Sequence, residues 1–274
     1  MATQLVIRDG DPHWWNSPDI WVVPGSDPNG IPGQPVAGEP AFVWGRVRNA
    51  GEQPVSGAVV NFYWSNPATG VLRSNSTPIG TAFVDLVAGE AKEVLCVVPW
   101  LPVVVNDGHE CLVAEVLHSA DPLPVPLPDA FNPPAYRQVA QKNLTVLVMK
   151  KSARVLPVQV AAPPRMAAAL TLTVEFGGEL DQENLVQVGL KGFRPARSNP
   201  FKAGLGMDGG CDEGRIADML KVELKPGSSR AVFLHLRPQD VLEPKTYQLV
   251  HVISRKGKEI EGGITYILVN AKEG

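Results

Sequence analysis

Short stretches of the chain alternate between apolar and polar residues, and this period of two predicts β-strands. Residues 41–48, for example, place Val43, Gly45 and Val47 on one face and Trp44 on the other. Gly, Pro, Asn or Asp separates each stretch from the next, as is typical of turns between short strands. In the first half we expect strands at 41–48, 58–65, 79–86, 92–99, 110–117 and 139–149. This spacing indicates an antiparallel β-sandwich.

The second half repeats the plan of the first at the level of pattern. Three segments recur in the same order, namely 89–99 as 227–238, 107–116 as 243–252, and 141–149 as 263–270. Recurrence in the same order indicates two copies of one structural unit. We therefore expect an all-β protein of two tandem antiparallel immunoglobulin-like β-sandwiches, residues 1–150 and 151–274, with the boundary near Lys150.

The second unit is expected to open with strands at 154–162, 169–176 and 184–190. It also contains the one short helix that the pattern predicts. Asp212 can cap this helix, and Ile216, Met219 and Leu220 follow at helical spacing.

The two units differ in the connection between their last two strands. The second unit has a short charged hairpin there, whereas the first has a Pro-rich loop at 119–137. Proline keeps most of such a loop out of a sheet interior. The loop either lies as a strap across the apolar surface of its own domain or binds a partner. In the second case Phe131, Pro133 and Pro134 are the candidate contact residues, for a protein partner or for self-association.

Composition narrows the class of protein. Apolar residues make up 44% of the 274 residues and charged residues 19%, which excludes a disordered tail or a coiled coil. A net charge of −3 argues against a nucleic-acid partner. The sequence has neither a transmembrane stretch nor the features of a secretory signal at its start, so we expect no membrane insertion. The expected location is cytoplasmic, or outside the cell by a non-Sec route.

Three cysteines, Cys96, Cys111 and Cys211, are present. We expect reduced, buried thiols, with a Cys96–Cys111 disulfide as the alternative.

Several stretches of the first half follow the pattern of one family. They are Ser17–Val22, Val43–Pro67 with its Arg-Asn-x-Gly turn and Tyr-Trp strand, 98–100, His109–Ala114 and Val139–Val146. In these residues the chain resembles the bacterial CARDB-like, immunoglobulin-type domains, over about residues 15–150. The resemblance implies a sandwich of about seven strands that binds or spaces and that has no shared catalytic residues. The second unit resembles a looser immunoglobulin-type sandwich.

The sequence lacks the GxSxG, GxxxxGK[ST], HExxH and CxxC motifs. Asp107, His109, His118, Ser119 and Asp121 crowd the ends of one expected strand. Closeness in sequence supplies neither a pocket nor an oxyanion hole, so hydrolysis is the third and weakest interpretation. We expect a protein without enzyme activity and without a cofactor.

One group of side chains near the start can hold a divalent cation. Asp9, Asp11 and His13 alternate along a segment that we expect to be extended, so all three would project to one side. The alternative is a solvated N-terminal strand. A second acidic group, whose members equally suit a helix N-terminus, consists of Asp208, Asp212 and Glu213.

All six tryptophans lie in the first hundred residues. Trp64 is expected in the core, as in immunoglobulin-type sandwiches. Trp14, Trp15 and Trp44 are candidate binding residues, because exposed aromatic rings stack on sugars or anchor protein interfaces. Cover by the chain itself is the alternative.

These features together predict a non-catalytic module for protein–protein contact. It would act as an adaptor, scaffold or assembly subunit of a bacterial complex. The alternative is a carbohydrate-binding or adhesion module that uses the aromatic residues of the first unit.

Overall fold

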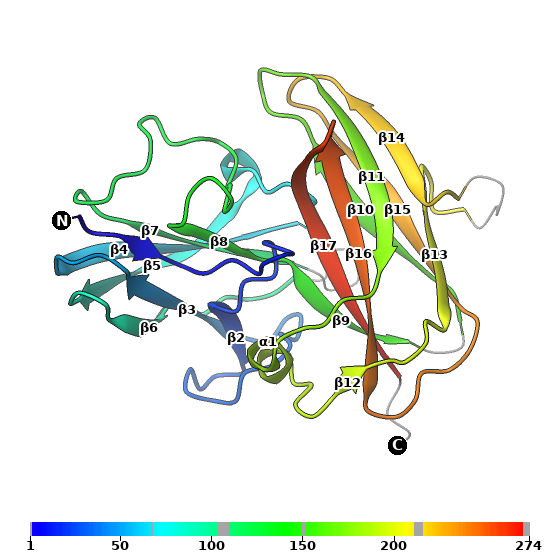
Figure 1. Cartoon of the computed structure of the whole chain (residues 1–274), viewed down its shortest axis with the longest axis horizontal. Helices are drawn as coiled ribbons and strands as arrows, with labels where there is room; N and C mark the ends of the chain where they lie inside the picture. Colours follow the sequence, from blue (N-terminus) through cyan, green and yellow to red (C-terminus); the bar gives the residue numbers. More distant parts are fainter. Residues whose placement is uncertain (1, 67, 104–109, 150–151, 211–215, 271–274) are drawn as a thin grey trace. The chain divides into compact units, whose positions relative to one another are not determined.

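The computed structural model describes residues 2–66, 68–103, 110–149, 152–210 and 216–270 (Figure 1). The chain forms two compact units. The first consists of Met1–Asn66, Val71–Asn143 and Val186–Gly189, and the second of Pro67–Gly70, Leu144–Leu185 and Leu190–Gly274. Within the described residues, regular structure is β-strand apart from one short α-helix and one 3₁₀ turn. The all-β sandwich class is therefore confirmed.

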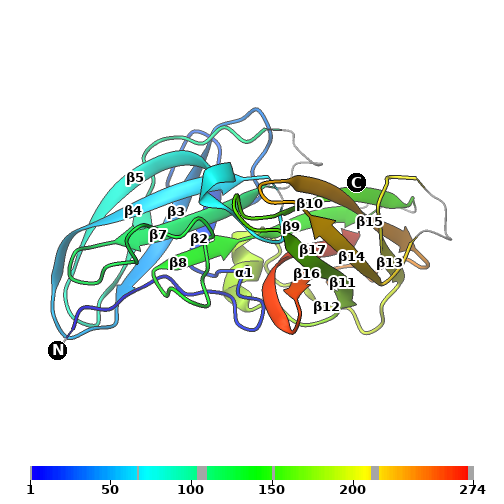
Figure 2. The same ribbon diagram turned by 90° about the horizontal axis from the view of Figure 1, so that it is seen from above.

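Two sheets form the first unit. One contains β1 (Leu5–Val6), β2 (Ile20–Pro24), β3 (Ala41–Asn49) and β6 (Ala91–Leu95), with β3 in the centre. The other runs in the order β5 (Thr77–Leu86), β4 (Val55–Ser65), β7 (Cys111–Leu117) and β8 (Val139–Lys142), as Figure 2 shows. The 3₁₀ turn η1 (Arg73–Asn75) connects β4 to β5. Alternate residues of each strand point inward, so Val43, Val47, Val60 and Phe62 are fully buried.

The second unit also has two sheets. One runs in the order β10 (Arg154–Ala161), β15 (Ser229–Pro238) and β13 (Phe201–Gly206). The other runs in the order β14 (Met219–Leu224), β11 (Ala168–Phe176), β16 (Thr246–Lys256), β17 (Glu259–Asn270) and β9 (Leu144–Met149), and β12 (Arg194–Pro195) pairs with β16. The helix α1 (Gln182–Gln187) lies between β11 and β12 in the chain. Val158, Leu172, Leu234 and Ile264 are fully buried in the core.

Strand pairing supports the internal repeat. In the first unit β3 pairs with β6, β4 with both β5 and β7, and β7 with β8. In the second unit β10 pairs with β15, β11 with both β14 and β16, and β16 with β17. The same connections therefore occur in the same chain order in both units.

The boundary between the units lies earlier than the sequence pattern indicated. The expected strand 139–149 is two strands, β8 and β9, separated by Asn143. β8 pairs with β7, whereas β9 runs parallel to β17 in the second unit. In this stretch the first unit thus ends at Asn143, and the second begins at Leu144, rather than near residue 150. A continuous apolar run cannot reveal the residue at which it leaves one sheet for another, and Lys150 itself lies outside the described residues.

The helix also lies at a different place in the chain from the one that the sequence pattern predicted. Residues expected as a strand at 184–190 contain most of α1, where Asp181 Oδ1 accepts a hydrogen bond from Asn184 N (2.6 Å) as a helix cap does. Met219 and Leu220 instead belong to β14, which pairs with β11, and Asp212 lies outside the described residues. Short apolar runs fit both periods, and pairing decides between them. Among the described residues, no helix has the length and apolarity to cross a membrane.

Candidate functional site

The residues proposed as a cation site do not form one. Residues 11–15 make turns, and Asn16 N donates to His13 O (2.8 Å), so the side chains of Asp9, Asp11 and His13 do not alternate along an extended segment. Burial, together with the charge of Asp11, raises the pKa of Asp9 above its usual value. Within the described part of the chain, no group of three His, Cys, Asp or Glu side chains is placed to hold a metal ion.

Of the candidate tryptophans, Trp15 is buried within the first unit, whereas Trp14 and Trp44 are half-buried. Trp15 is fully buried, and Trp14 packs edge-on against it with ring centres 5.6 Å apart. Trp44 stacks on Trp21 at 6.0 Å with nearly parallel rings, and its Nε1 donates to Pro28 O (2.9 Å). Trp15 is thus closed to a sugar, and one face of the Trp44 ring is occupied by Trp21.

Trp64 is less central than expected. It is only partly buried and packs against the rim of the core, whereas Phe62 of the same strand is fully buried in the middle. The two residues lie on the same face of β4, so the pattern identified the face correctly but not the central residue.

The Pro-rich loop lies against the outer face of β7 and β8. Phe131 is 3% exposed and packs with Val71, Val113 and Val139 in a small apolar cluster. Pro133 is also buried, and only Pro134 of the three proposed contact residues is exposed. Phe131 and Pro133 are therefore not exposed to a partner, and for Phe131 the strands β7 and β8 supply the cover.

A buried ionic group sits beneath this loop, and sequence reasoning did not find it. The carboxylate of Glu115 on β7 accepts hydrogen bonds from Arg73 Nη1 (2.8 Å), Arg73 Nη2 (2.9 Å) and Tyr63 OH (2.8 Å). The Arg73 guanidinium in turn lies 4.2 Å from the centre of the Phe131 ring, in a cation–π contact. Burial and the Glu115 charge raise the pKa of Tyr63 to about 12.

Each member of this ionic group comes from a different connection or strand. Arg73 is in η1 and is 42 residues from Glu115 in the chain, so no local motif marks the pair. Both carboxylate oxygens of Glu115 are engaged, and its side chain is 1% exposed. The geometry suits a structural ion pair that fixes the loop, since a base or a metal ligand needs a lone pair open to its ligand.

The described residues of the proposed hydrolytic group include Asp121 and His118, and the side chains of both are hydrogen-bonded to nearby parts of the first unit. The carboxylate of Asp121 accepts hydrogen bonds from Leu5 N (2.7 Å) and from Arg137, and His118 Nδ1 accepts one from Ala120 N (3.1 Å). Five residues that the sequence analysis singled out lie outside the described residues, namely Asp107, His109, Cys211, Asp212 and Glu213.

The two described cysteines are buried in separate places. Cys96 lies in the core between the two sheets, where burial raises the pKa of its thiol. Cys111 belongs to the cluster beneath the Pro-rich loop, and its Sγ donates to Asn143 Oδ1 (2.8 Å). The two thiols do not bond to each other, which excludes the alternative disulfide.

An open sheet edge with apolar side chains follows β6. After β6 the chain stays beside the first residues of β3 but bulges, since Cys96 N donates to Val43 O (2.9 Å) and Trp100 N to Ala41 O (2.7 Å), with four residues opposite two. Cys96 and Trp100 face the core, while Val97 and Leu101 point outward and are 68% and 57% exposed. Among the described residues, no group bonds to the backbone N–H of Val97 or Leu101. This edge combines unpaired backbone groups with exposed apolar side chains.

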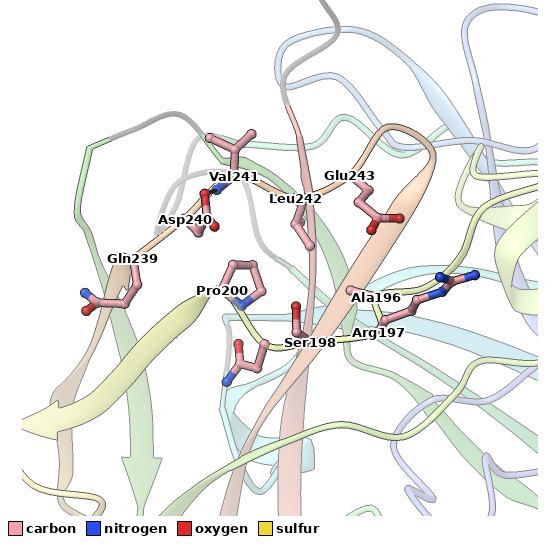
Figure 3. A pocket seen from close by; sticks show the side chains of 10 residues that line it. Ala196, Arg197, Ser198, Pro200, Gln239, Asp240, Val241, Leu242 and Glu243 are labelled. Atoms are coloured by element: carbon pink, nitrogen blue, oxygen red, sulfur yellow. Dashed lines mark hydrogen bonds between the residues drawn. The ribbon is translucent and has the colours of Figure 1, made fainter.

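A shallow pocket of about 190 Å³ lies at one end of the second unit (Figure 3). Two connections form it, the one between β12 and β13 and the one between β15 and β16. Hydrogen bonds to Pro200 O from Gln239 N (2.7 Å) and Asp240 N (3.2 Å) join the two connections. The lining residues are Ala196, Arg197, Ser198, Asn199, Pro200, Gln239, Asp240, Val241, Leu242 and Glu243.

No family model and no curated protein matches the chain. Among solved structures, a red sea bream transglutaminase is 13% identical, with a TM-score of 0.24 over 100% of this chain and 32% of that one. The CupB6 tip adhesin of Pseudomonas aeruginosa is 8% identical over 99% of both chains (TM-score 0.27). The collagen adhesin CNA of S. aureus is 9% identical over 92% of both chains (TM-score 0.22). TM-scores this low carry no conclusion about function, and the β-sandwich assignment rests on the strand pairing.

Proposed function

We propose that the chain is a non-catalytic protein-binding module that acts as an adaptor, scaffold or assembly subunit of a bacterial complex. The observation that supports this proposal is the open edge of the first unit at residues 91–103. A partner segment in extended conformation can add to such an edge as a further strand, with main-chain hydrogen bonds giving affinity. The resemblance of the first unit to CARDB-like domains, which bind or space, agrees with this class of role.

The chemistry of the edge specifies the kind of partner segment. Val97 and Leu101 offer backbone hydrogen bonds and apolar side chains, while Pro99 between them has no N–H to donate. The added strand would therefore pair at Val97 and at Leu101 and would place its own apolar residues over these two side chains. Charged residues and prolines discourage this kind of pairing, and the edge carries Lys92 and Glu93 at its start and prolines at 99 and 102, so the added strand would be confined to Val97 and Leu101.

The test introduces charge at the edge. In the double variant Val97→Lys/Leu101→Lys, we expect loss of partner capture from a lysate, and loss of self-association by light scattering if the partner is a second copy. Val125→Lys is the matched control, because Val125 is 93% exposed and lies in the Pro-rich loop. All three side chains are exposed, so thermal unfolding should stay close to that of the wild type.

The possible results separate the two surfaces. A protein that wild type and Val125→Lys capture, but the double variant does not, supports the edge. Equal capture by all three proteins contradicts the proposal. Loss with Val125→Lys alone also contradicts it, and would assign the contact to the Pro-rich loop.

A further inference from the structure

The pocket of the second unit has a preformed frame. Besides the two bonds to Pro200 O, Val241 N donates to Asp240 Oδ1 (2.8 Å), and Thr246 Oγ1 donates to Glu243 O (2.8 Å). Asn270 Nδ2 on β17 donates to Leu242 O (3.2 Å). Main-chain and side-chain bonds thus hold both connections, and the rim side chains of Asp240 and Asn199 each accept one of them, Asn199 Oδ1 from Phe201 N (3.0 Å). A preformed frame lowers the ordering cost of binding a ligand.

The rim offers hydrogen-bonding groups of both kinds. Among the described residues, the Arg197 guanidinium and the Ser198 hydroxyl have no side-chain or backbone partner. Asp240 keeps one carboxylate oxygen open, and Glu243 shares one oxygen with Arg194 Nη2 (3.3 Å). Donors and acceptors are therefore both present.

Two buried apolar side chains lie within a mostly polar lining, and the charges in and beside the pocket balance. Pro200 and Leu242 are buried, and in Figure 3 they lie between Asp240 on one side and Glu243 on the other. Arg197 is the one lining arginine, and Arg194, which lies outside the lining, pairs with Glu243 (3.3 Å), so the two carboxylates are offset only when Arg194 is included. A pocket with no net charge does not select an ion, whereas hydroxyl groups can both donate to carboxylates and accept from a guanidinium.

We propose that this pocket binds a neutral polyhydroxylated ligand of the size of one sugar ring. A cavity of about 190 Å³ holds several water molecules, which such a ring would displace. The hydroxyls would bond to Asp240, Glu243 and Arg197, and the C–H face of the ring would lie on Pro200 and Leu242. This site is separate from the aromatic residues of the first unit and independent of the strand edge at residues 91–103.

The experiment is a ligand-observed NMR titration of the full chain with single monosaccharides, namely glucose, galactose, mannose and N-acetylglucosamine. For a shallow site and a ligand of this size we expect saturable binding with a Kd in about the millimolar range. Asp240→Asn should weaken that binding at least about tenfold, and so should Arg197→Met, since each removes charged hydrogen bonds. The amide oxygen of Asp240→Asn can still accept from Val241 N, so the frame is kept.

Two variants of the same kind serve as controls in the same unit. Asp218→Asn and Arg230→Met change exposed residues that do not line the pocket, and both should bind as the wild type does. Absence of saturable binding for every sugar well above the millimolar range overturns the proposal. So does binding that the pocket variants and the controls weaken equally. Stronger binding of a zwitterionic amino acid such as glycine than of any sugar would overturn the ligand class.

Discussion

The two units share the pairing of their neighbouring strands but cover the outer faces of these strands differently. In the first unit the connection between β7 and β8, residues 118–138, folds back over the strands that it joins. In the second unit β16 and β17 are joined by a tight turn at Gly257. The segment after β11 supplies the cover there: His251 Nε2 lies 2.9 Å from Gly177 O, and Leu180 N donates to Tyr247 OH (3.1 Å).

The two covers differ because a buried ion pair lies beneath the first, whereas the described side-chain contacts beneath the second are made by a tyrosine hydroxyl and a histidine ring. Beneath the first cover, the buried Glu115 carboxylate depends on Arg73, and the Phe131 ring lies against Arg73. The contacts of Tyr247 and His251 beneath the second cover join neutral groups or a ring nitrogen to backbone atoms. A buried charge that loses its partner costs far more than a lost neutral hydrogen bond. The first unit should therefore be the more sensitive of the two to changes under its cover.

Breaking the ion pair should have the largest effect. Arg73→Met leaves the Glu115 carboxylate buried with only the neutral donors Tyr63 OH (2.8 Å) and Asn61 Nδ2 (3.5 Å), and we expect a loss of about 3–5 kcal/mol in the free energy of unfolding of the first unit. Tryptophan fluorescence during urea denaturation measures it, because all six tryptophans lie in the first unit.

The matched control for this change is Arg255→Met in the second unit, whose ion pair with Glu175 is partly exposed. A loss of no more than about 1 kcal/mol is expected there, followed by far-UV circular dichroism. Arg73→Met/Glu115→Leu, which removes both charges, should recover much of the stability. Equal, small losses for both single variants would contradict the difference between the covers.

The second-largest loss of stability should follow from removing the Phe131 ring of the Pro-rich loop. Phe131→Ala deletes a buried aromatic side chain and leaves a cavity against Val113, and we expect a loss of about 3 kcal/mol in the unfolding free energy of the first unit. Val125→Ala, in the exposed part of the same loop, should change it by less than about 0.5 kcal/mol. A near-zero effect of Phe131→Ala would show that the loop does not stabilise the sheet beneath it.

The pH dependence of unfolding should distinguish the two units, through Glu110, the residue just before β7. Burial raises the pKa of this carboxyl to about 7, although its Oε1 accepts a hydrogen bond from Val103 N (3.0 Å). A carboxyl with a raised folded-state pKa contributes stability below its unfolded pKa and loses it as pH rises toward about 7. We expect Glu110→Gln to be more stable than wild type at pH 8, on the order of 2 kcal/mol, and similar at pH 5.

The exposed substitution Glu52→Gln is the control for this pH dependence and should parallel the wild type at both pH values. Unfolding followed by tryptophan fluorescence again reports on the first unit. Parallel curves for Glu110→Gln and wild type between pH 5 and pH 8 would contradict a raised pKa.

The smallest effects should come from the two tyrosines. Tyr63→Phe removes a hydrogen bond to a carboxylate, and we expect a loss of about 2 kcal/mol. Tyr247→Phe removes a neutral bond to Leu180 N, for which about 1 kcal/mol is expected. Thermal unfolding followed by circular dichroism and fluorescence compares the two. A larger loss for Tyr247→Phe would reverse the ranking of the covers.

Local pattern predicted most of the strands because alternation and turn residues are properties of neighbouring positions. The inward face of β3 is the expected one, and β10 and β11 lie close to their expected bounds. α1 was missed because Leu185 and Val188 are equally compatible with a short buried strand. Of the proposed site residues, Trp15, Phe131 and Pro133 are buried, since aromatic and Pro-rich segments cover a domain's own surface as readily as a partner's.

The sequence by itself determined the class of the fold, the inward faces of most strands and the repetition of the unit, because each depends on the order of nearby side chains. Tertiary structure alone decided that β9 pairs with β17, that Arg73 meets Glu115 beneath Phe131, and that Val97 and Leu101 stay exposed. These features depend on which distant segments cover or pair with one another. Hydrophobic burial is non-directional, so an apolar side chain specifies that it needs cover but not which part of the chain supplies it.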